Sequence, residues 1–243
     1  MREIITTGKN MGFLFLVIFV ISCGNNLTDL SGATRNKARD RMVRQLEEYG
    51  IRDERVLAAM KSVPRHLFIP KKYRDNFAAY GDHPGPIGYG QTISQPYIVA
   101  YMTERLDPKP GENVLEIGTG SGYQAAVLAA LGAEVYSIEI IPELADHARK
   151  VLEEQGVGNI HILTGDGYKG WPEYSPFDSI IVTCGPERIP RLLVDQLKEG
   201  GRMILPLGAH SRQRLVICRK KGGEVMVEED LPVRFVPMVH GER

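Results

Sequence analysis

The 243-residue chain has little cysteine, no excess of either charge, and no apolar run as long as a membrane-spanning helix. Its three cysteines, Cys23, Cys184 and Cys218, show neither CxxC spacing nor a neighbouring histidine cluster, so neither a disulfide framework nor a zinc site is indicated. Lysine plus arginine and aspartate plus glutamate each number 30, which gives a formal net charge of zero. Because phosphate binding needs a concentrated basic surface, we expect no nucleic-acid partner.

The N-terminal segment differs in composition from the rest. Arg2 and Lys9 precede an apolar run over 11–21, which is about half of the roughly twenty residues that a membrane-spanning helix needs. A basic start, a short apolar centre and a small residue before the cut are typical of a secretory signal. The tetrapeptide Val20-Ile21-Ser22-Cys23 also resembles the lipobox of bacterial lipoproteins, in which the cysteine is lipidated. The alternative is a start codon assigned too far upstream.

Beyond this leader, the sequence predicts one α/β domain. We expect a leader or non-core segment over 1–33 and a single domain over 34–243. In the domain, short apolar runs alternate with helical patterns, which predicts a doubly wound, mostly parallel sheet. The expected strands are 114–117, 134–140, 160–163, 178–183 and 203–207. The expected helices are 37–49, 53–61, 123–131, 142–154 and 190–198, the last stopped by Gly200-Gly201, and a C-terminal antiparallel hairpin is expected over 214–228.

A glycine cluster, Gly118-Thr119-Gly120-Ser121-Gly122, follows the first of these strands and precedes a helix, the context in which glycines let a ligand lie against the main chain. Tyr123 replaces the third glycine of the dinucleotide fingerprint, which fits a cofactor without a pyrophosphate. Glu139 ends the second strand, where a carboxylate can accept hydrogen bonds from ribose hydroxyls. Asp166-Gly167 follows the third strand. Each acid alone is equally well explained as a helix cap or loop residue, but the set indicates a ligand at this sheet edge.

A second cluster of interest is Gly88 to Pro96, which enters an amphipathic helix after a Gly- and Pro-rich stretch over 80–90. A stretch of that length inside a compact domain favours a functional loop. Ser94 lies just before a helix opened by proline and is therefore a typical N-cap. A hydroxyl at a helix N-terminus can also receive a carboxylate, and the two readings are compatible.

These segments resemble the protein-L-isoaspartate (D-aspartate) O-methyltransferase family over roughly residues 37–240. The shared segments are Val63-Pro64-Arg65-His66-Leu67-Phe68-Ile69-Pro70, Gly90-Gln91-Thr92-Ile93-Ser94-Gln95-Pro96, Leu115 to Tyr123, Gly165-Asp166-Gly167 and Val233-Arg234-Phe235-Val236-Pro237. The stretch from Thr92 to Ser94 is the most specific to the family, whereas many methyltransferases share the glycine cluster. One departure is Thr183-Cys184-Gly185-Pro186, where the family usually has alanines before the proline.

The resemblance implies a Rossmann-like class I methyltransferase fold with S-adenosylmethionine as methyl donor and no metal. The acceptor would be the free carboxylate of an isoaspartyl or D-aspartyl residue in a damaged protein, whose methyl ester then collapses to a succinimide. Ser94 would take the active-site role, and Thr92, Ile93, Val233, Arg234 and Phe235 would lie against the substrate. The residues expected to bind the cofactor are Glu116, Gly118, Thr119, Gly120, Ser121, Gly122, Glu139, Ile140, Asp166 and Gly167.

Two alternatives remain open on the sequence. The first is a methyltransferase of the same fold that acts on a small molecule or on another protein carboxylate, since one fold hosts many functions. The second is a non-catalytic envelope lipoprotein that has kept the fold, cleaved after residue 22 and lipidated at Cys23. Cofactor supply and the family resemblance favour the cytoplasm, whereas the leader favours export. We expect a monomer. A membrane contact is expected only if Cys23 is lipidated.

Overall fold

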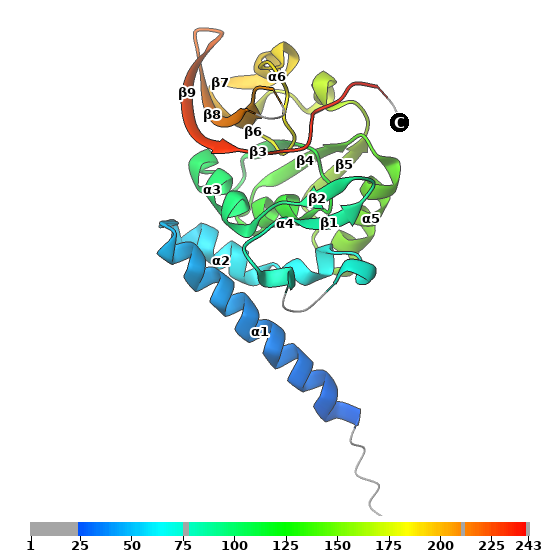
Figure 1. The fold of residues 1–243 in the computed structure, drawn as a ribbon. Helices are drawn as coiled ribbons and strands as arrows, with labels where there is room; N and C mark the ends of the chain where they lie inside the picture. The colour runs from blue at the N-terminus through cyan, green and yellow to red at the C-terminus, as the bar shows by residue number, and fades with distance from the viewer. Residues whose placement is uncertain (1–23, 75–77, 210–211, 242–243) are drawn as a thin grey trace, which may run out of the picture.

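The computed structural model describes residues 24–74, 78–209 and 212–241. Its centre is a seven-stranded sheet in the order β5-β4-β3-β6-β7-β8-β9 (Figure 1). The pairings from β5 through β7 are parallel, and β8 runs antiparallel to both of its neighbours. The strands are β3 (Asn113–Ile117), β4 (Glu134–Glu139), β5 (Ile160–Thr164), β6 (Phe177–Val182), β7 (Leu197–Leu207), β8 (Gln213–Lys221) and β9 (Glu224–Val233).

Helices cover both faces of the sheet. The helices are α1 (Gly24–Glu48), α2 (Glu54–Ser62), α3 (Pro96–Leu106), α4 (Tyr123–Ala130), α5 (Pro142–Glu154) and α6 (Arg191–Gln196). Short 3-10 turns are η1 (Arg65–Phe68), η2 (Lys71–Tyr73), η3 (Ala78–Tyr80), η4 (Gly167–Lys169) and η5 (Pro172–Tyr174). On one face, Leu106 of α3 and Leu128 of α4 pack against Val114 and Ile181. On the other face, Leu193 of α6 packs with the β6 residue Phe177 and its neighbours.

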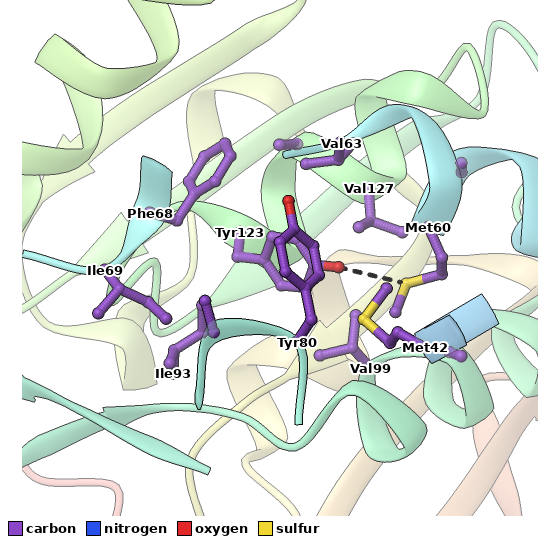
Figure 2. Close-up of a cluster of buried hydrophobic side chains, with 14 of the residues drawn as sticks. Met42, Met60, Val63, Phe68, Ile69, Tyr80, Ile93, Val99, Tyr123 and Val127 are labelled. Carbon is purple, nitrogen blue, oxygen red and sulfur yellow. Dashed lines mark hydrogen bonds between the residues drawn. The ribbon is translucent and has the colours of Figure 1, made fainter. Parts of the chain in front are cut away.

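The N-terminal helices add a third apolar cluster, which joins them to the start of α4. Met42 of α1 and Met60 of α2 pack with Tyr80 and with Tyr123, the first residue of α4 (Figure 2). The Tyr123 hydroxyl lies 3.8 Å from the Met60 sulfur, and the Phe68 ring meets the Tyr123 ring edge-on at 5.6 Å. The layer that α1 and α2 form is therefore fixed directly to the helix that follows the glycine cluster.

The predicted sheet is confirmed, including the C-terminal hairpin of β8 and β9 around Gly222-Gly223. The boundary between one helix and the next strand is wrong: the helix predicted over 190–198 ends at Gln196, β7 begins at Leu197 and not at 203, and Gly200-Gly201 lies inside β7. The physical reason is close packing, since a Cβ at Gly201 would lie 2.8 Å from the Lys198 carbonyl oxygen and 2.9 Å from that of Asp178. Gly201 lets β7 approach β6, and the glycine pair does not stop the helix.

The stretch over 80–90 was expected to be a loop, but it contains one arm of a small antiparallel ribbon. Strands β1 (Gly85–Gly88) and β2 (Gln91–Ile93) pair around Tyr89-Gly90. Both turn residues have positive φ, 53° and 70°, as a tight two-residue hairpin turn requires. The sequence hides this hairpin because glycine and Pro86 are poor strand residues.

Helix α1 runs away from the body of the fold (Figure 1). It begins at Gly24, inside the segment assigned to the leader, so the boundary at 33 remains a prediction. The apolar run over 11–21 and Cys23 lie outside the described residues. Among the residues that are described, none of the helices is both long and apolar enough to span a bilayer.

Candidate active site

One cavity opens at the carboxyl edge of the parallel strands, where β3 and β6 lie side by side and the chain turns to opposite sides of the sheet. Open α/β sheets bind their ligands at such a switch point. The cavity wall contains ten residues predicted for the site, namely Thr92, Ile93, Ser94, Gly118, Thr119, Gly120, Ser121, Glu139, Ile140 and Gly167. Segments far apart in the chain therefore meet where the sequence expected a ligand.

The glycine cluster is held from both sides. Gly118 has φ of 95°, and a Cβ there would lie 2.6 Å from the Thr183 hydroxyl, so only glycine fits. That hydroxyl donates to the Gly118 carbonyl oxygen at 2.6 Å, and the Gly120 amide donates to the Glu139 carboxylate at 2.7 Å. The loop is thus bonded to the residue that follows β6 and to the last residue of β4.

Glu139 is 5% exposed, and what remains exposed faces the cavity. One carboxylate oxygen accepts from Gly120 and the other from the Ile141 amide at 3.0 Å. Burial raises the pKa of Glu139, while these amides oppose the rise. Each oxygen keeps a further lone pair, so the carboxylate can still accept hydrogen bonds from a ligand's hydroxyls.

Glu116 lies beneath the cavity and not in its wall. Its side chain is fully buried, and one oxygen accepts from the Ser137 hydroxyl at 2.5 Å, which in turn pairs with the Thr119 hydroxyl at 2.6 Å. The other oxygen has no partner among the described residues. Burial raises the pKa of Glu116 to about 8, with Glu139 adding to the rise. In the structure Glu116 is linked to the glycine loop through Ser137 and Thr119 and does not line the cavity, and its role in cofactor binding stays a prediction.

Two other predicted cofactor residues also lie outside the cavity wall. A Cβ at Gly122 would lie 3.2 Å from the Ala148 side chain, so this glycine allows α4 and α5 to pack closely. The Asp166 carboxylate accepts from the Tyr168 amide at 2.9 Å and from His240 and the Gly241 amide at 3.3 Å each. Burial opposes the shift, but these donors hold the pKa of Asp166 below its usual value. Asp166 thus anchors the C-terminal segment.

The C-terminal segment forms part of the wall, but three residues later than predicted. Val233, Arg234 and Phe235 do not line the cavity, whereas Val236, Pro237, Met238 and Val239 do. Val233 is the last residue of β9, and the Phe235 amide donates to Gln213 at 2.6 Å. Gly185 then exchanges backbone hydrogen bonds with Val236 and Met238 at 2.7 and 3.0 Å. These bonds draw the chain across the end of β6 only after residue 235.

Ser94 lies in the cavity wall and does not cap α3. The N-cap position is Gln95, and the Ser94 hydroxyl makes no hydrogen bond with any described residue. Of the two readings of Ser94, the structure supports an uncommitted hydroxyl that faces the cavity. The wall also contains residues that sequence reasoning missed, Tyr123, Gln124 and Cys184, whose only signal was their place just after the glycines or after β6.

The wall suits a neutral or cationic ligand with hydroxyl groups. Within the described part of the chain, the lining includes no lysine, arginine or histidine, and Glu139 is its one carboxylate. Bare backbone at Gly118 and Gly120 leaves room for a ligand to lie flat against the loop. In the same part of the chain, no three His, Cys, Asp or Glu side chains are grouped so that they could hold a metal ion.

The mostly parallel sheet ends in the antiparallel strands β8 and β9 and has a glycine loop after β3 and a carboxylate at the end of β4, which together are the class I methyltransferase fold. The model of the protein-L-isoaspartate(D-aspartate) O-methyltransferase family matches residues 36–243. The chain therefore belongs to that family.

Individual relatives agree. A protein-L-isoaspartate O-methyltransferase of Gloeobacter violaceus is 53% identical over 80% of this chain and 94% of its own length. One from Opitutus terrae is 55% identical over 84% of this chain and 87% of its own. A solved protein-L-isoaspartate O-methyltransferase superposes with a TM-score of 0.76 at 33% identity, covering 82% of this chain and 65% of that one. A putative Plasmodium falciparum enzyme solved with S-adenosyl-L-homocysteine superposes with a TM-score of 0.74 at 26% identity, covering 84% and 99%.

The buried Glu116 generates a prediction about stability. The folded chain keeps the Glu116 proton up to about pH 8, whereas the unfolded chain releases it near its ordinary pKa of 4.5. Between these values unfolding releases a proton, so the free energy of unfolding falls as pH rises, by at most about 1.4 kcal/mol per pH unit. Glu116→Gln removes this dependence. We expect the variant to lose less stability than the wild type from pH 5 to pH 8 in urea titrations, and parallel curves for the two proteins would contradict it.

Proposed function

We propose that this chain transfers a methyl group from S-adenosylmethionine to the free carboxylate of L-isoaspartyl residues in damaged proteins. The single observation that carries the proposal is the cavity itself. It joins the glycine loop and Glu139 to the segment from Thr92 to Ser94, the stretch most specific to the family. Membership of the family over residues 36–243 and the names of the relatives supply the acceptor. The resulting ester would close to a succinimide without further help from the enzyme.

The two sides of the cavity divide the binding. Gly118 to Ser121 and the Glu139 carboxylate would hold the donor, with Glu139 accepting from its ribose hydroxyls. When bound, the donor supplies a methyl group on a positively charged sulfur. Thr92 to Ser94 on one side and Val236 to Val239 on the other would enclose the acceptor. We also propose that Thr92 and Ile93 contact the substrate directly. Val233, Arg234 and Phe235 would contact it at the rim of the cavity.

The chain's own residues need to orient the acceptor more than activate it. A carboxylate with an unperturbed pKa of about 4 is already ionised at neutral pH and needs no general base. No cationic side chain of the described residues lines the cavity, so none would hold the acceptor in its unreactive, salt-bridged form. The Ser94 hydroxyl can donate one hydrogen bond and fix the direction of attack. Positioning of this kind supplies much of a methyl-transfer rate.

The methylation assay tests both the activity and the role of Ser94. We expect label transfer to an isoaspartyl peptide and none to its aspartyl twin. Ser94→Ala should lower kcat by about tenfold or more, while the affinity for S-adenosylhomocysteine stays within about twofold, because the hydroxyl faces the acceptor.

The kcat should be nearly flat from about pH 6 to 8. A steep rise through pH 7 that disappears when one side chain is mutated would show that a base is needed. Equal transfer to both peptides would reject the substrate.

Glu139 provides the test of the cofactor side. Glu139→Ala should weaken S-adenosylmethionine binding by roughly 1.5–3 kcal/mol, the range for hydrogen bonds to a charged group. Glu139→Gln keeps one acceptor oxygen for the Gly120 amide but turns its NH2 group toward the Ile141 amide, so its affinity should lie between those of the wild type and Glu139→Ala. Calorimetry that gives wild-type affinity for the alanine variant would remove Glu139 from the site.

We place the active enzyme in the cytoplasm, because S-adenosylmethionine is made there, and we propose that it acts as a monomer. A net charge of zero supports the absence of a nucleic-acid partner. Fractionation of the native organism tests the location. We expect the protein in the cytoplasmic fraction, with no change on Cys23→Ser. Recovery in the envelope, with release or blocked processing in Cys23→Ser, would establish export and lipidation instead.

A further inference from the structure

The start of α3 presents a capping problem that its own residues do not solve. Pro96 opens the helix and has no amide hydrogen, the N-cap residue Gln95 makes no side-chain cap bond, and Ser94 makes none either. The Tyr97 amide would then be an unpaired donor at the positive end of the helix. A hydrogen bond to the Tyr97 amide from elsewhere in the chain would therefore fix the position of residues 94–96, which come directly before it.

That bond comes from Asp82, fifteen positions earlier in the chain. One Asp82 oxygen accepts from the Tyr97 amide at 2.8 Å, and the other accepts from the Gln95 side-chain amide at 2.8 Å. The two contacts lie one and three residues after Ser94. Because Asp82 occupies the position in which a local serine would cap the helix, the Ser94 hydroxyl remains uncommitted in the cavity wall.

The segment that carries Asp82 is held by a buried arginine. Arg65 is 1% exposed, its Nε donates to the Ala79 carbonyl oxygen at 2.9 Å, and Nη2 donates to that of His83 at 3.4 Å. These two carbonyls bracket Asp82. Burial lowers the pKa of Arg65 to about 10, with the Asp82 carboxylate among the groups that oppose the shift, so the guanidinium stays charged at neutral pH.

The same guanidinium also contacts the cofactor side of the fold. Its central carbon lies 5.0 Å from the centre of the Tyr123 ring, and Tyr123 is the residue directly after the glycine cluster, in the apolar cluster of Figure 2. Ile87 of β1 belongs to the same apolar cluster, and its side chain lies 3.5 Å from the position of a Cβ on Gly120, so β1 packs against the glycine loop. Arg65 thus touches both the helix that begins at the glycine loop and the segment that presents Asp82.

We propose that Asp82, held by Arg65, is a positioning residue for methyl transfer, which caps α3 from outside so that the Ser94 hydroxyl is both fixed in place and free to meet the acceptor. The inference rests on the proposed function, because Ser94 acts on the acceptor only if that function is right. It gives a role to Arg65, which lies in a segment that the chain shares with the family and does not line the cavity.

The kinetic test compares Asp82→Ala with Asp82→Asn. The alanine variant loses both bonds, and kcat toward an isoaspartyl peptide should fall on the order of ten- to a hundredfold. The asparagine variant can accept from Tyr97, and its amide can pair with Gln95 if that side chain turns over, so kcat should recover to within about threefold of the wild type. The dissociation constant and binding stoichiometry of S-adenosylhomocysteine should stay within about twofold in both.

Asp53 offers a matched control. Its carboxylate caps α2 by accepting from the Arg55 amide at 2.8 Å. Asp53 does not line the cavity. Asp53→Ala should lower the melting temperature to a similar extent as Asp82→Ala and leave kcat unchanged. If Asp82→Ala loses kcat and cofactor stoichiometry together and asparagine restores neither, the residue has a merely structural role and the proposal is wrong.

A double-variant cycle tests the path through Ser94. If Asp82 acts by placing that hydroxyl, Asp82→Ala should cost little further activity in a Ser94→Ala background. The proposal would be overturned if the fold-loss of kcat in the double variant equals the product of the two single losses, or if Ser94→Ala keeps the wild-type kcat.

Amide exchange of the S-adenosylhomocysteine complex keeps the test independent of activity. Asp82→Ala should speed exchange in the first turn of α3 by about tenfold, and Asp53→Ala should not. Unchanged exchange at that turn would overturn the capping role. A wild type that methylates no isoaspartyl peptide would reject the proposed function and leave this readout to decide whether Asp82 fixes the segment.

Discussion

The close approach of the glycine loop to its two neighbouring strands is the constraint on which the rest of the site depends. The Glu139 carboxylate and the Thr183 hydroxyl each hold one peptide of the loop, at 2.7 and 2.6 Å. The Thr183 bond would not form if Gly118 carried a side chain, because a Cβ there would lie 2.6 Å from the Thr183 hydroxyl. Because the loop is fixed at both ends, its direction sets where α4 begins, and α4 begins with Tyr123. That ring is in turn the surface on which Arg65 and the N-terminal layer rest.

Much of this arrangement could be predicted from the sequence, since strands in a doubly wound sheet carry periodic apolar runs and the glycines follow one of them. Ten of the predicted site residues line the cavity. Glu116 could not be separated from Glu139 in this way, because both are acids at the end of apolar runs. Only the register of β3 beside β4 shows that Glu116 lies next to Ser137 beneath the loop. Position in the fold, and not residue type, decides which acid reaches the cavity wall.

Other misses have a common cause in contacts between distant segments. The cavity-lining C-terminal residues begin at Val236 because Gln213 and Gly185 hold the backbone there, and nothing near residue 236 in the sequence indicates this. The hairpin of β1 and β2 is built from residues with poor strand propensity. Ser94 looks like a helix cap until the position of Asp82 is known. Local patterns find elements well, whereas long-range hydrogen bonds decide which atom of a motif is available for chemistry.

The two cysteines of the described residues have a consequence for where such an enzyme can work. Cys184 lies in the cavity wall and Cys218 in the core, and burial raises the pKa of both thiols, with the nearby Glu139 and Glu116 adding to the shift at Cys184. Thiolates are the species that oxidants and disulfides attack, so the raised pKa makes both thiols weak nucleophiles near neutral pH. A more oxidising environment would therefore leave these two side chains slow to react.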